Sequence, residues 1–587
     1  MNKNSNSVSG AKKPEGKARR LIRILKEDGF GVALYKLKGR IQRNKDASNG
    51  PAFFDKEQLL KEENTVFPKD IKYSVLVPLF NTPKDFLTQM IDSVKAQSYK
   101  NWELCLAYGS DEEHSYVKAI ADEYAKNDGR IKYKKLLKNK GISENTNECI
   151  KMATGNYLAL FDHDDLLHPS VLFEYAKAIC EKNADLLYCD EDKFETPEKG
   201  FYDAYYKPDF AVDDLRANNY ICHFTVFKRE LLNKAGLLRS EFDGSQDHDL
   251  ILRLTENAQC IVHIPKVLYH WRVSKASVAW NPYAKPYTIE AGKKAVFEHL
   301  KRCGIAAKVV SSRAHPNIYR IRYELTSKPL VSIIINAGTK KAAEELLKSV
   351  KDNAEYENYE IIALYENHSS DVRENAVFKD VSHLKNKSVP SLLNYGASLA
   401  KGEQLLFLNG AKRVFSKGFI SELLMFALRK DVGAAGAMLL NPGNTVNSAG
   451  MILGINGTAG DAFFGVPAGY SGYFGKCAYQ RDVFAVSSGC MMIKKSAFIE
   501  AGGFDEAYKE AFFDADICLK LEDKGYITAW TPYAKICVLK KTKAVNGEDA
   551  ERFKEKWRER IIAGDRYYNP NLSLRHTDFR VKDNCER

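Results

Sequence analysis

A chain of 587 residues is long enough for two or more domains, each with its own core. The net charge is +12, but residues 1–45 hold 13 Lys/Arg against 3 Asp/Glu, which leaves only +2 for the other 542 residues. The near-neutral body therefore does not support a nucleic-acid-binding surface, and we expect no nucleic-acid partner. No two of the 12 cysteines have Cys-x-x-Cys spacing, so we expect reduced thiols of a cytosolic protein and no zinc site. No apolar run reaches the length of about 18 residues that spans a membrane, and the polar opening does not resemble a secretory signal.

The N-terminal region is polar and then basic. Residues 1–16 are predicted to be a disordered tail, and residues 17–68 a basic amphipathic helical segment with a linker. Leu21, Ile22 and Leu25 share one helical face, and the pattern resumes after Gly31. Two interpretations stay open. Residues 17–45 either lie on the anionic inner membrane surface or form a helix docked on the protein's own body.

From residue 73 the pattern alternates regularly between strands and helices. Apolar runs predict strands at 73–80, 102–108, 131–137 and 157–161, with helices between them at about 83–94, 115–126 and 144–153. We expect Thr82 to cap the first helix, with Pro83 at its first position. Strands that alternate with helices predict right-handed crossovers and a mostly parallel sheet, which defines an α/β fold class.

The segment NYLALFDHDDLLHP (156–169) is central to the functional interpretation. Its apolar strand ends at Asp162, His163, Asp164 and Asp165, and ligands of open α/β sheets bind beyond the carboxyl ends of strands. Grouped carboxylates repel one another unless a cation joins them, and oxygen ligands suit Mg²⁺ or Mn²⁺. Such a cation would bind a diphosphate. Asp-x-Asp recurs elsewhere in this chain, so the preceding strand, rather than the spacing, favours a metal site.

Two later acidic motifs have both a structural and a functional interpretation. ADLLYCDEDK (184–193) again places acids after an apolar run. SQDHDLILRL (245–254) predicts a helix capped by Ser245, with Asp247 and Asp249 in its first turn. Carboxylates at a helix N-terminus are favourable by themselves, but one of them can also project into a cleft as a general base.

The pattern lapses near 310–328 and then repeats with a period of about 260 residues, which indicates a duplicated domain. KPLVSIIINAGTKKAAEELLKSV (328–350) parallels residues 71–94, and AFFDADICLKLEDKGY (511–526) parallels the segment around Asp247. At the position of the aspartate cluster the second copy has Asn409, Gly410, Ala411 and Lys412, which cannot hold a divalent cation.

Several motifs occur in an order that resembles family 2 glycosyltransferases: VPLFNTP, NKGISENTN, ALFDHDDLLHP, LYCDEDK, GSQDHDLILRL and LYHWR. The layout resembles bacterial tandem-domain members that build cell-surface polysaccharides. The resemblance implies two GT-A domains: an active one over 70–325 and a degenerate one over 328–570, followed by a tail at 571–587. It also implies a nucleotide-diphosphate sugar donor, a saccharide or lipid-linked saccharide acceptor, inversion, and Mg²⁺ or Mn²⁺.

The resemblance assigns roles to residues of the first copy. Asp247 matches the general base, while Asp164, Asp165 and His270 match the metal site. A packed histidine is the structural alternative for His270. Tyr108 stands where the family usually has an acid that reads the base, which leaves donor-base selectivity undefined. The residues matched to nucleotide-sugar binding are Pro78, Phe80, Asn81, Asn139, Gly141, Asn145, Asp162, Asp192 and Arg272.

Alternative functions are distinguished by their sequence requirements. A bifunctional transferase would need activity in the second copy as well, and a carbohydrate-binding or scaffold protein would not need the aspartates of the first. A nucleotidyltransferase is disfavoured because VPLFNTP lacks a Gly-rich loop with a basic residue. We expect the second copy to bind the acceptor or to mediate dimerisation, and the protein to be cytoplasmic, with peripheral contact to the membrane through residues 17–45.

Overall fold

The structure is a computed structural model that describes residues 31–32, 35, 55–273, 286–311, 314–365, 371–373, 376–382, 388–539, 547–583 and 585–586. The predicted tail at 1–16 and nearly all of the predicted basic segment up to residue 54 lie outside the described residues. Helix α3 (Lys56–Glu63) lies in the predicted linker. Among the described residues, no helix combines the length and apolarity needed to cross a membrane.

The first half of the chain forms a nine-stranded sheet with the order β3-β2-β1-β4-β8-β6-β9-β5, and β7 pairs with β6. β3, β2, β1 and β4 run parallel, β8 is antiparallel to both β4 and β6, and β6 and β9 are parallel. Its strands are β1 (Tyr73–Leu79), β2 (Trp102–Tyr108), β3 (Ile131–Lys135), β4 (Tyr157–Leu160), β5 (Leu166–Leu167), β6 (Leu186–Phe194), β7 (Phe201–Tyr205), β8 (Val226–Lys228) and β9 (Ile261–Arg272).

Helices connect these strands much as the sequence predicts. They are α4 (Lys84–Lys95), α5 (Tyr116–Asn127), α6 (Ile142–Met152), α7 (Val171–Lys182), α8 (Val212–Ala217), α9 (Arg229–Ala235), α10 (Gln246–Thr255) and α11 (Pro286–Arg302). The predicted cap of α4 is wrong by one residue. Pro83 occupies the N-cap, and the Thr82 hydroxyl instead bonds His163 Nδ1 at 3.0 Å. Ser245 is the N-cap residue of α10, but its hydroxyl donates to Thr288 O rather than capping the helix.

The second half repeats this topology, which confirms the predicted tandem α/β fold class. Its main sheet has the order β15-β13-β12-β16-β23-β18-β24-β17, and each neighbouring pair has the same orientation as its counterpart in the first sheet. These strands are β12 (Val331–Gly338), β13 (Tyr359–Tyr365), β15 (Ala376–Asp380), β16 (Gln404–Asn409), β17 (Ala411–Val414), β18 (Val432–Leu440), β23 (Met491–Lys494) and β24 (Ile527–Val538).

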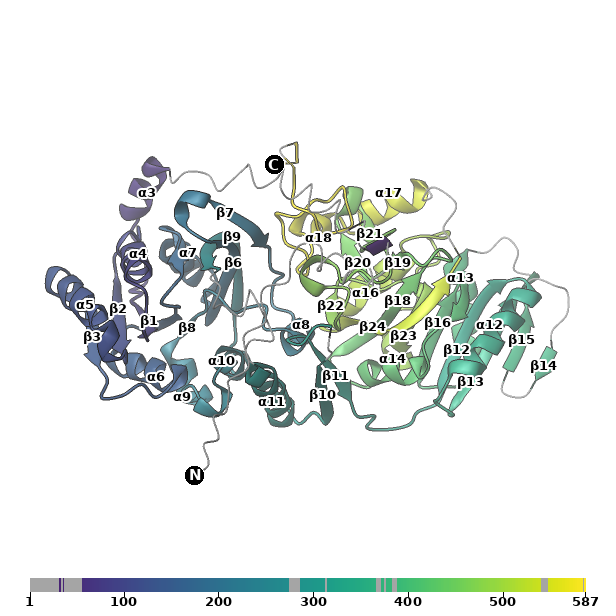
Figure 1. The fold of residues 1–587 in the computed structure, drawn as a ribbon. Coiled ribbons are helices and arrows are strands. Elements are labelled where there is room, and N and C mark those ends of the chain that lie inside the picture. The colour runs from purple at the N-terminus through teal and green to yellow at the C-terminus, as the bar shows by residue number, and fades with distance from the viewer. Residues whose placement is uncertain are drawn as a thin grey trace, which may run out of the picture.

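Further elements flank the second sheet and join the halves. Figure 1 shows the two sheets side by side, with α8, α11 and the β10–β11 hairpin between them. The helices are α12 (Lys340–Asn353), α13 (Val389–Leu399), α14 (Phe419–Ala427), α15 (Lys495–Glu500), α16 (Phe513–Glu522), α17 (Gly547–Lys556) and α18 (Arg558–Ala563). The short strands are β10 (Ala307–Ser311), β11 (Tyr319–Tyr323), β14 (Asp371–Arg373), β19 (Val446–Ser448), β20 (Met451–Leu453), β21 (Ala459–Asp461) and β22 (Arg481–Val483).

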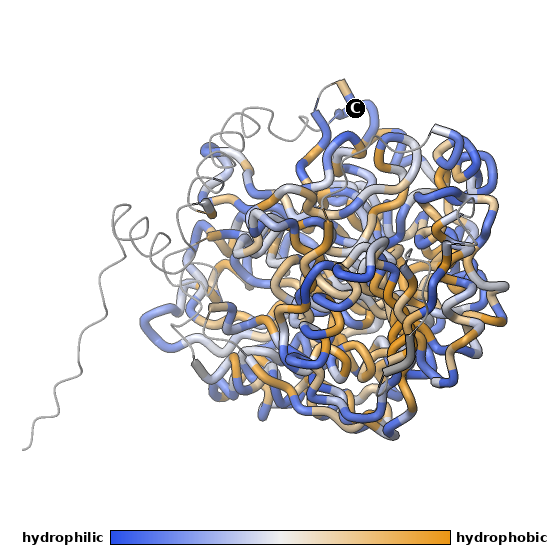
Figure 2. The backbone as a smooth tube through the Cα atoms, turned by 90° about the vertical axis from the view of Figure 1, so that its right-hand side faces the viewer, coloured by the Kyte–Doolittle hydropathy of each residue, from blue (hydrophilic) through white to orange (hydrophobic). Residues whose placement is uncertain are grey.

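The two halves share a buried interface. Apolar residues of both halves form one continuous core cluster, and hydrophobic segments run through the interior in Figure 2. Charged groups are also buried there, because Asp213 of α8 pairs with Arg429 of the second half at 2.7 Å. The Tyr205 ring stacks on Phe474 at 4.1 Å between centroids. Polar and apolar contacts together fix the halves against each other.

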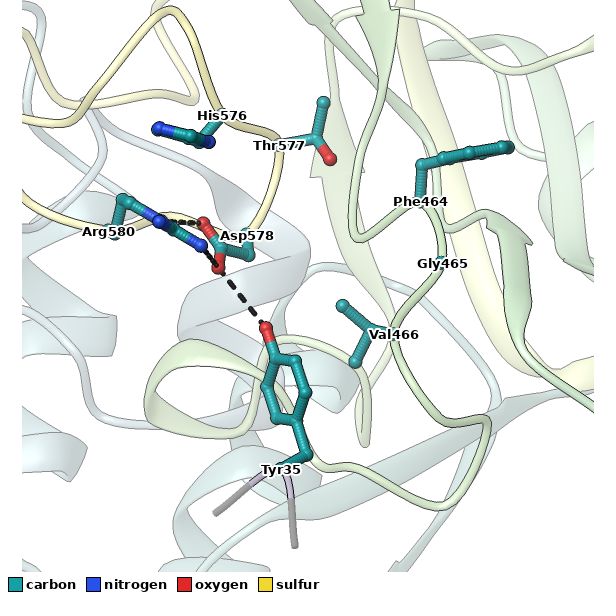
Figure 3. Close-up of a pocket in the computed structure, with 8 residues that line it drawn as sticks. All are labelled: Tyr35, Phe464, Gly465, Val466, His576, Thr577, Asp578 and Arg580. Atoms are coloured by element: carbon teal, nitrogen blue, oxygen red, sulfur yellow. Dashed lines mark hydrogen bonds and ion pairs between the residues drawn. The ribbon is translucent and has the colours of Figure 1, made fainter. Parts of the chain in front are cut away.

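Tyr35 of the N-terminal segment lies against the second half. Val32 is buried, and the Tyr35 hydroxyl donates to Asp578 Oδ2 at 3.1 Å. Figure 3 shows this hydroxyl pointing at the carboxylate that Arg580 also binds. The Tyr35 ring also packs against Tyr470 at 4.9 Å. At these positions the segment is therefore docked on the protein's own body.

Candidate active site

The carboxyl ends of β1, β2 and β4 bring three loops together. Asn81 follows β1 with a positive φ of 50°, and its backbone N–H donates to Ser110 Oγ at 2.8 Å. Its side-chain amide donates to Asp111 Oδ2 at 2.8 Å. Thr82 reaches His163 in the loop after β4. Phe80, which is 45% exposed, stands beside these contacts, and Pro78 lies opposite Ala107 within the sheet. These bonds tie the predicted nucleotide loop to the aspartate loop.

Asp165 is the buried anchor of the aspartate loop. It has no exposed surface and accepts hydrogen bonds from the Tyr269 hydroxyl and, at 2.7 Å, from the backbone N–H of Arg272. Burial, together with the charges of Asp164 and Asp162, raises the pKa of Asp165 well above its usual range. The site thus holds more carboxylates than it can ionise without a compensating positive charge.

A histidine that we did not predict from the sequence completes this cluster. Side-chain oxygens of Asp162 and Asp165 and a ring nitrogen of His223 lie within 4.8 Å of one another. His223 Nε2 is 3.6 Å from Asp162 Oδ2, and its ring stacks on Tyr269 at 4.6 Å with an interplanar angle of 3°. Burial would lower the pKa of His223, but its polar neighbours raise it well above its usual range. The cluster therefore favours positive charge.

His223 is held from behind by a buried ion pair. Its Nδ1 lies 3.2 Å from Glu191 Oε2, and the fully buried Lys207 ammonium donates to the same oxygen at 2.9 Å. Lys207 also donates to the carbonyls of Ile221, at 2.9 Å, and His223, at 2.7 Å. Lys207 thereby holds both the backbone of His223 and its side-chain partner Glu191.

Asp247 lies next to this cluster in the first turn of α10. Its Oδ2 accepts from Asn219 Nδ2 at 2.8 Å and lies 3.5 Å from Cys222 Sγ. Cys222 Sγ is in turn 3.4 Å from His223 Nε2. Asp162 and Asp247 are therefore separated by two adjoining side chains, so the structure brings the two predicted carboxylates to one locality.

The NKGISENTN motif positions the segment that precedes α10. Asn145 Nδ2 donates to Asn139 Oδ1 at 2.8 Å, which closes the turn around Gly141. Gly141 has a φ of 94°, and a side chain there would lie 2.4 Å from Asp243 Oδ2. Ser143 Oγ donates to the other oxygen of Asp243 at 2.5 Å. The motif is thus hydrogen-bonded to Asp243, in the loop that leads into α10 and Asp247.

Two predicted residues, His270 and Arg272, have other partners. His270 Nδ1 bonds Asp192 Oδ1 at 2.7 Å, and His270 lies next to Tyr269, so strand alternation points it away from the face that contacts Asp165. The buried Arg272 guanidinium stacks between Phe86 and Phe194. It donates to Asp164 O at 2.5 Å and to Gln89 Oε1 at 2.8 Å. Arg272 thus braces the aspartate loop, while His270 and Asp192 form a separate buried pair.

The equivalent positions of the second half lack the two aspartates and the histidine of this cluster. Counting along the matched β4–β8 and β16–β23 ladders places Asn409 at the position of Asp162 and Gly489 at that of His223. A Cβ at Gly489 would lie 2.7 Å from Leu439 Cδ1, so a larger side chain has no room. The same count places Lys412 at the position of Asp165, so the second sheet has an amide, a lysine and apolar packing in place of the anionic cluster.

Sequence reasoning missed residues whose role depends on three-dimensional contacts. Glu191 and Tyr269 lie in motifs that we singled out, but the predictions selected their neighbours Asp192 and His270. Neighbouring residues of a strand point to opposite faces of the sheet. A single sequence does not show which of the two faces meets the aspartates. The only signal for His223 is a polar residue three positions before the strand β8.

Comparisons with known proteins identify the family of this chain. Residues 74–236 match the family model described as glycosyl transferase family 2. The putative glycosyltransferase EpsE of Bacillus subtilis is 30% identical over 37% of this chain and 78% of its own length. The O-antigen biosynthesis protein RfbC of Myxococcus xanthus is 32% identical over 87% of this chain and 41% of its own length. This chain spans about half the length of the curated relatives that match most of it.

The chain belongs to the family 2 glycosyltransferases. Among solved structures, Staphylococcus aureus TarS 1–349 in complex with UDP-GlcNAc matches with a TM-score of 0.33 and 18% identity, covering 39% of this chain and 66% of TarS 1–349.

Proposed function

We propose that this chain transfers a sugar, with inversion, from a nucleotide-diphosphate donor to a growing bacterial surface polysaccharide. The observation that carries the proposal is the cluster of Asp162, Asp165 and His223 beside Asp247, at the carboxyl edge of a parallel sheet. Membership in family 2 supports sugar transfer, and the O-antigen role named for RfbC supports a polysaccharide acceptor.

The residues present fit a divalent cation. Two carboxylates and an imidazole are suitable ligands for Mg²⁺ or Mn²⁺, and the cluster already favours positive charge. A bound cation would offset the negative charge that develops on the leaving diphosphate. We propose Asp162, Asp165 and His223 as the residues that hold it, while the roles predicted for Asp164 and His270 stay predictions.

Asp247 is the proposed general base. Its position in the first turn of α10 favours negative charge, because the helix N-terminus is the positive end of the dipole. Asn219 holds one carboxylate oxygen at 2.8 Å and so orients the group. Asp247 would take the proton from the acceptor hydroxyl as that oxygen attacks the anomeric carbon. No activated Ser or Cys nucleophile is required, because inversion proceeds by a single displacement.

A donor panel tests the proposal. UDP-, dTDP- and GDP-sugars are incubated with the full chain, with and without Mn²⁺, and release of the nucleoside diphosphate is measured. We expect Mn²⁺-dependent turnover of at least one donor, and we expect Asp247→Asn to lower kcat by about 10²–10⁴ while donor KM changes little. The exposed Glu241→Gln is the matched control on the preceding segment. A panel without turnover would contradict sugar transfer, and wild-type turnover in Asp247→Asn would remove the base assignment.

The second half is proposed to be inactive toward donors, which opposes the bifunctional alternative. Asn409 and Gly489 support this interpretation because neither side chain carries a charge. If the full-length Asp247→Asn protein still transferred a second kind of sugar at the wild-type rate, both halves would be active. Membrane contact through residues 17–45, dimerisation and a cytoplasmic location stay predictions.

A further inference from the structure

The segment after α18 crosses from the second half to the first. The Asp209 backbone N–H donates to Arg566 O at 2.8 Å, and Asn571 Nδ2 donates to Pro265 O at 2.8 Å. Between these contacts Asn569 is only 3% exposed. In Figure 1 this yellow segment continues from α18 on the side of the second half that faces the first. A side chain from near the C-terminus is thereby buried against the first half.

The Asn569 side chain binds both Asp190 and the backbone of Lys207. Its Nδ2 donates to Asp190 Oδ1 at 3.1 Å, to Asp190 Oδ2 at 3.0 Å and to Lys207 O at 2.9 Å. Asp190 also accepts from the Lys207 backbone N–H at 2.8 Å and bonds His263 Nε2 at 2.9 Å. The backbone of Lys207 is therefore held at its N–H through Asp190 and at its carbonyl by Asn569.

Lys207 connects this anchor to the proposed active site. Its buried ammonium bonds Glu191 and the carbonyls of Ile221 and His223, as described above. Glu191 in turn contacts the His223 ring, which reaches Asp162. A continuous path of hydrogen bonds and ion pairs therefore runs from Asn569 to the cluster proposed to hold the cation.

We propose that Asn569 is a positioning residue for His223, so that the second half contributes to the active site of the first. The inference rests on the proposed function. Removing the Asn569 amide would leave the buried Lys207 carbonyl without that donor and would remove the N–H that the two oxygens of Asp190 share. The lysine backbone would then be free to shift, and the loop that carries His223 would shift with it.

The test compares Asn569→Ala with Tyr479→Phe in the full chain. The buried Tyr479 hydroxyl donates to Asp214 Oδ1 at 3.3 Å, so the control also removes a hydrogen bond between the halves but leaves the path to His223 intact. Binding of Mn²⁺ alone is followed by water-proton relaxation, and kcat and donor KM are measured separately. We expect Asn569→Ala to weaken Mn²⁺ binding and lower kcat by about tenfold each, because partners behind a metal ligand commonly contribute this much.

The outcomes separate this inference from the proposed function. Equal Mn²⁺ affinity and equal kcat in Asn569→Ala and Tyr479→Phe, with an active wild-type chain, would overturn the role of Asn569 alone. A wild-type chain that neither binds Mn²⁺ nor turns over a donor would contradict both proposals. Asn569→Ser, which keeps one hydroxyl donor, is the second variant in case the alanine protein does not fold. A larger decrease of Mn²⁺ affinity and kcat in Asn569→Ser than in Tyr479→Phe supports the inference, and an equal decrease overturns it.

Discussion

Replacing Glu191 with Gln removes the central charge of the ion-pair network behind His223. Burial alone would raise the pKa of Glu191, but the Lys207 ammonium and the His223 ring lower it from the usual 4.5 to about 2. Glu191 is only 8% exposed, and its contacts of 2.9 Å to Lys207 and 3.2 Å to His223 are shielded from solvent. Gln keeps the size of the side chain and loses the charge, so the substitution reports the electrostatic contribution.

The pKa difference gives both the size and the sign of the effect. A shift from 4.5 to about 2 corresponds to about 3 kcal/mol of the free energy of unfolding at pH 7. Because the folded-state pKa is depressed, this stability is fully present above pH 4.5 and is lost as the pH falls through about 2. At pH 3.5 the contribution should be about 2 kcal/mol. Glu191→Gln should therefore destabilise the protein less as the pH falls.

Urea unfolding followed by circular dichroism at pH 7 and pH 3.5 measures these differences. Glu174→Gln is the control, because Glu174 pairs at 2.5 Å with Lys266, whose side chain is 56% exposed. A partly exposed pair of this kind contributes about 1 kcal/mol or less. The electrostatic reasoning would be refuted if Glu191→Gln lowered the free energy of unfolding no more than the control does. It would also be refuted if the decrease were the same at both pH values.

Two further substitutions test the cation site and the interface. Asp162→Asn should raise the Mn²⁺ concentration needed for half-maximal donor turnover by at least about tenfold, because it removes one proposed ligand; unchanged Mn²⁺ dependence would exclude Asp162 from the site. Asp213→Asn should lower the free energy of unfolding by about 3–5 kcal/mol, because it leaves the buried Arg216 without its carboxylate partner and leaves Arg429 with Asp431 alone. Urea unfolding checks the second prediction, and a loss below about 1 kcal/mol would show that Asp213 does not hold the halves together.

Local patterns predicted most of the architecture. β1, β2 and β4 are apolar runs because they are covered on both faces, and such runs stand out between amphipathic helices. The duplication was visible because the same succession of motifs appears twice, and the matching strand orders confirm it. Helix capping was less predictable. Threonine commonly caps helices, but the Thr82 hydroxyl bonds His163, which follows a different strand. Tertiary contact overrode the local preference at that position.

The candidate site was only partly predictable for a similar reason. Asp162 and Asp165 could be predicted because they directly follow an apolar strand, and strand ends define the ligand-binding edge of an α/β sheet. His223 could not, because it approaches them from a loop more than 50 residues away in sequence. The pairing of Leu167 with Tyr269 and of Leu166 with His270 decides which β9 side chain faces Asp165. Residue types alone carry no information about that register.

The two halves share a fold but differ in the side chains at the positions of the candidate site. Strand order and orientation are the same in both sheets, because they depend on apolar cores that both halves keep. Asp514 also keeps a partner equivalent to that of Asp247, since the Ser488 hydroxyl donates to Asp514 Oδ2 at 3.4 Å and Cys222 Sγ lies 3.5 Å from Asp247 Oδ2. Neither property depends on a cation. The second half instead carries Asn569, which reaches Lys207 of the first half, and this is the contact that we propose to position His223.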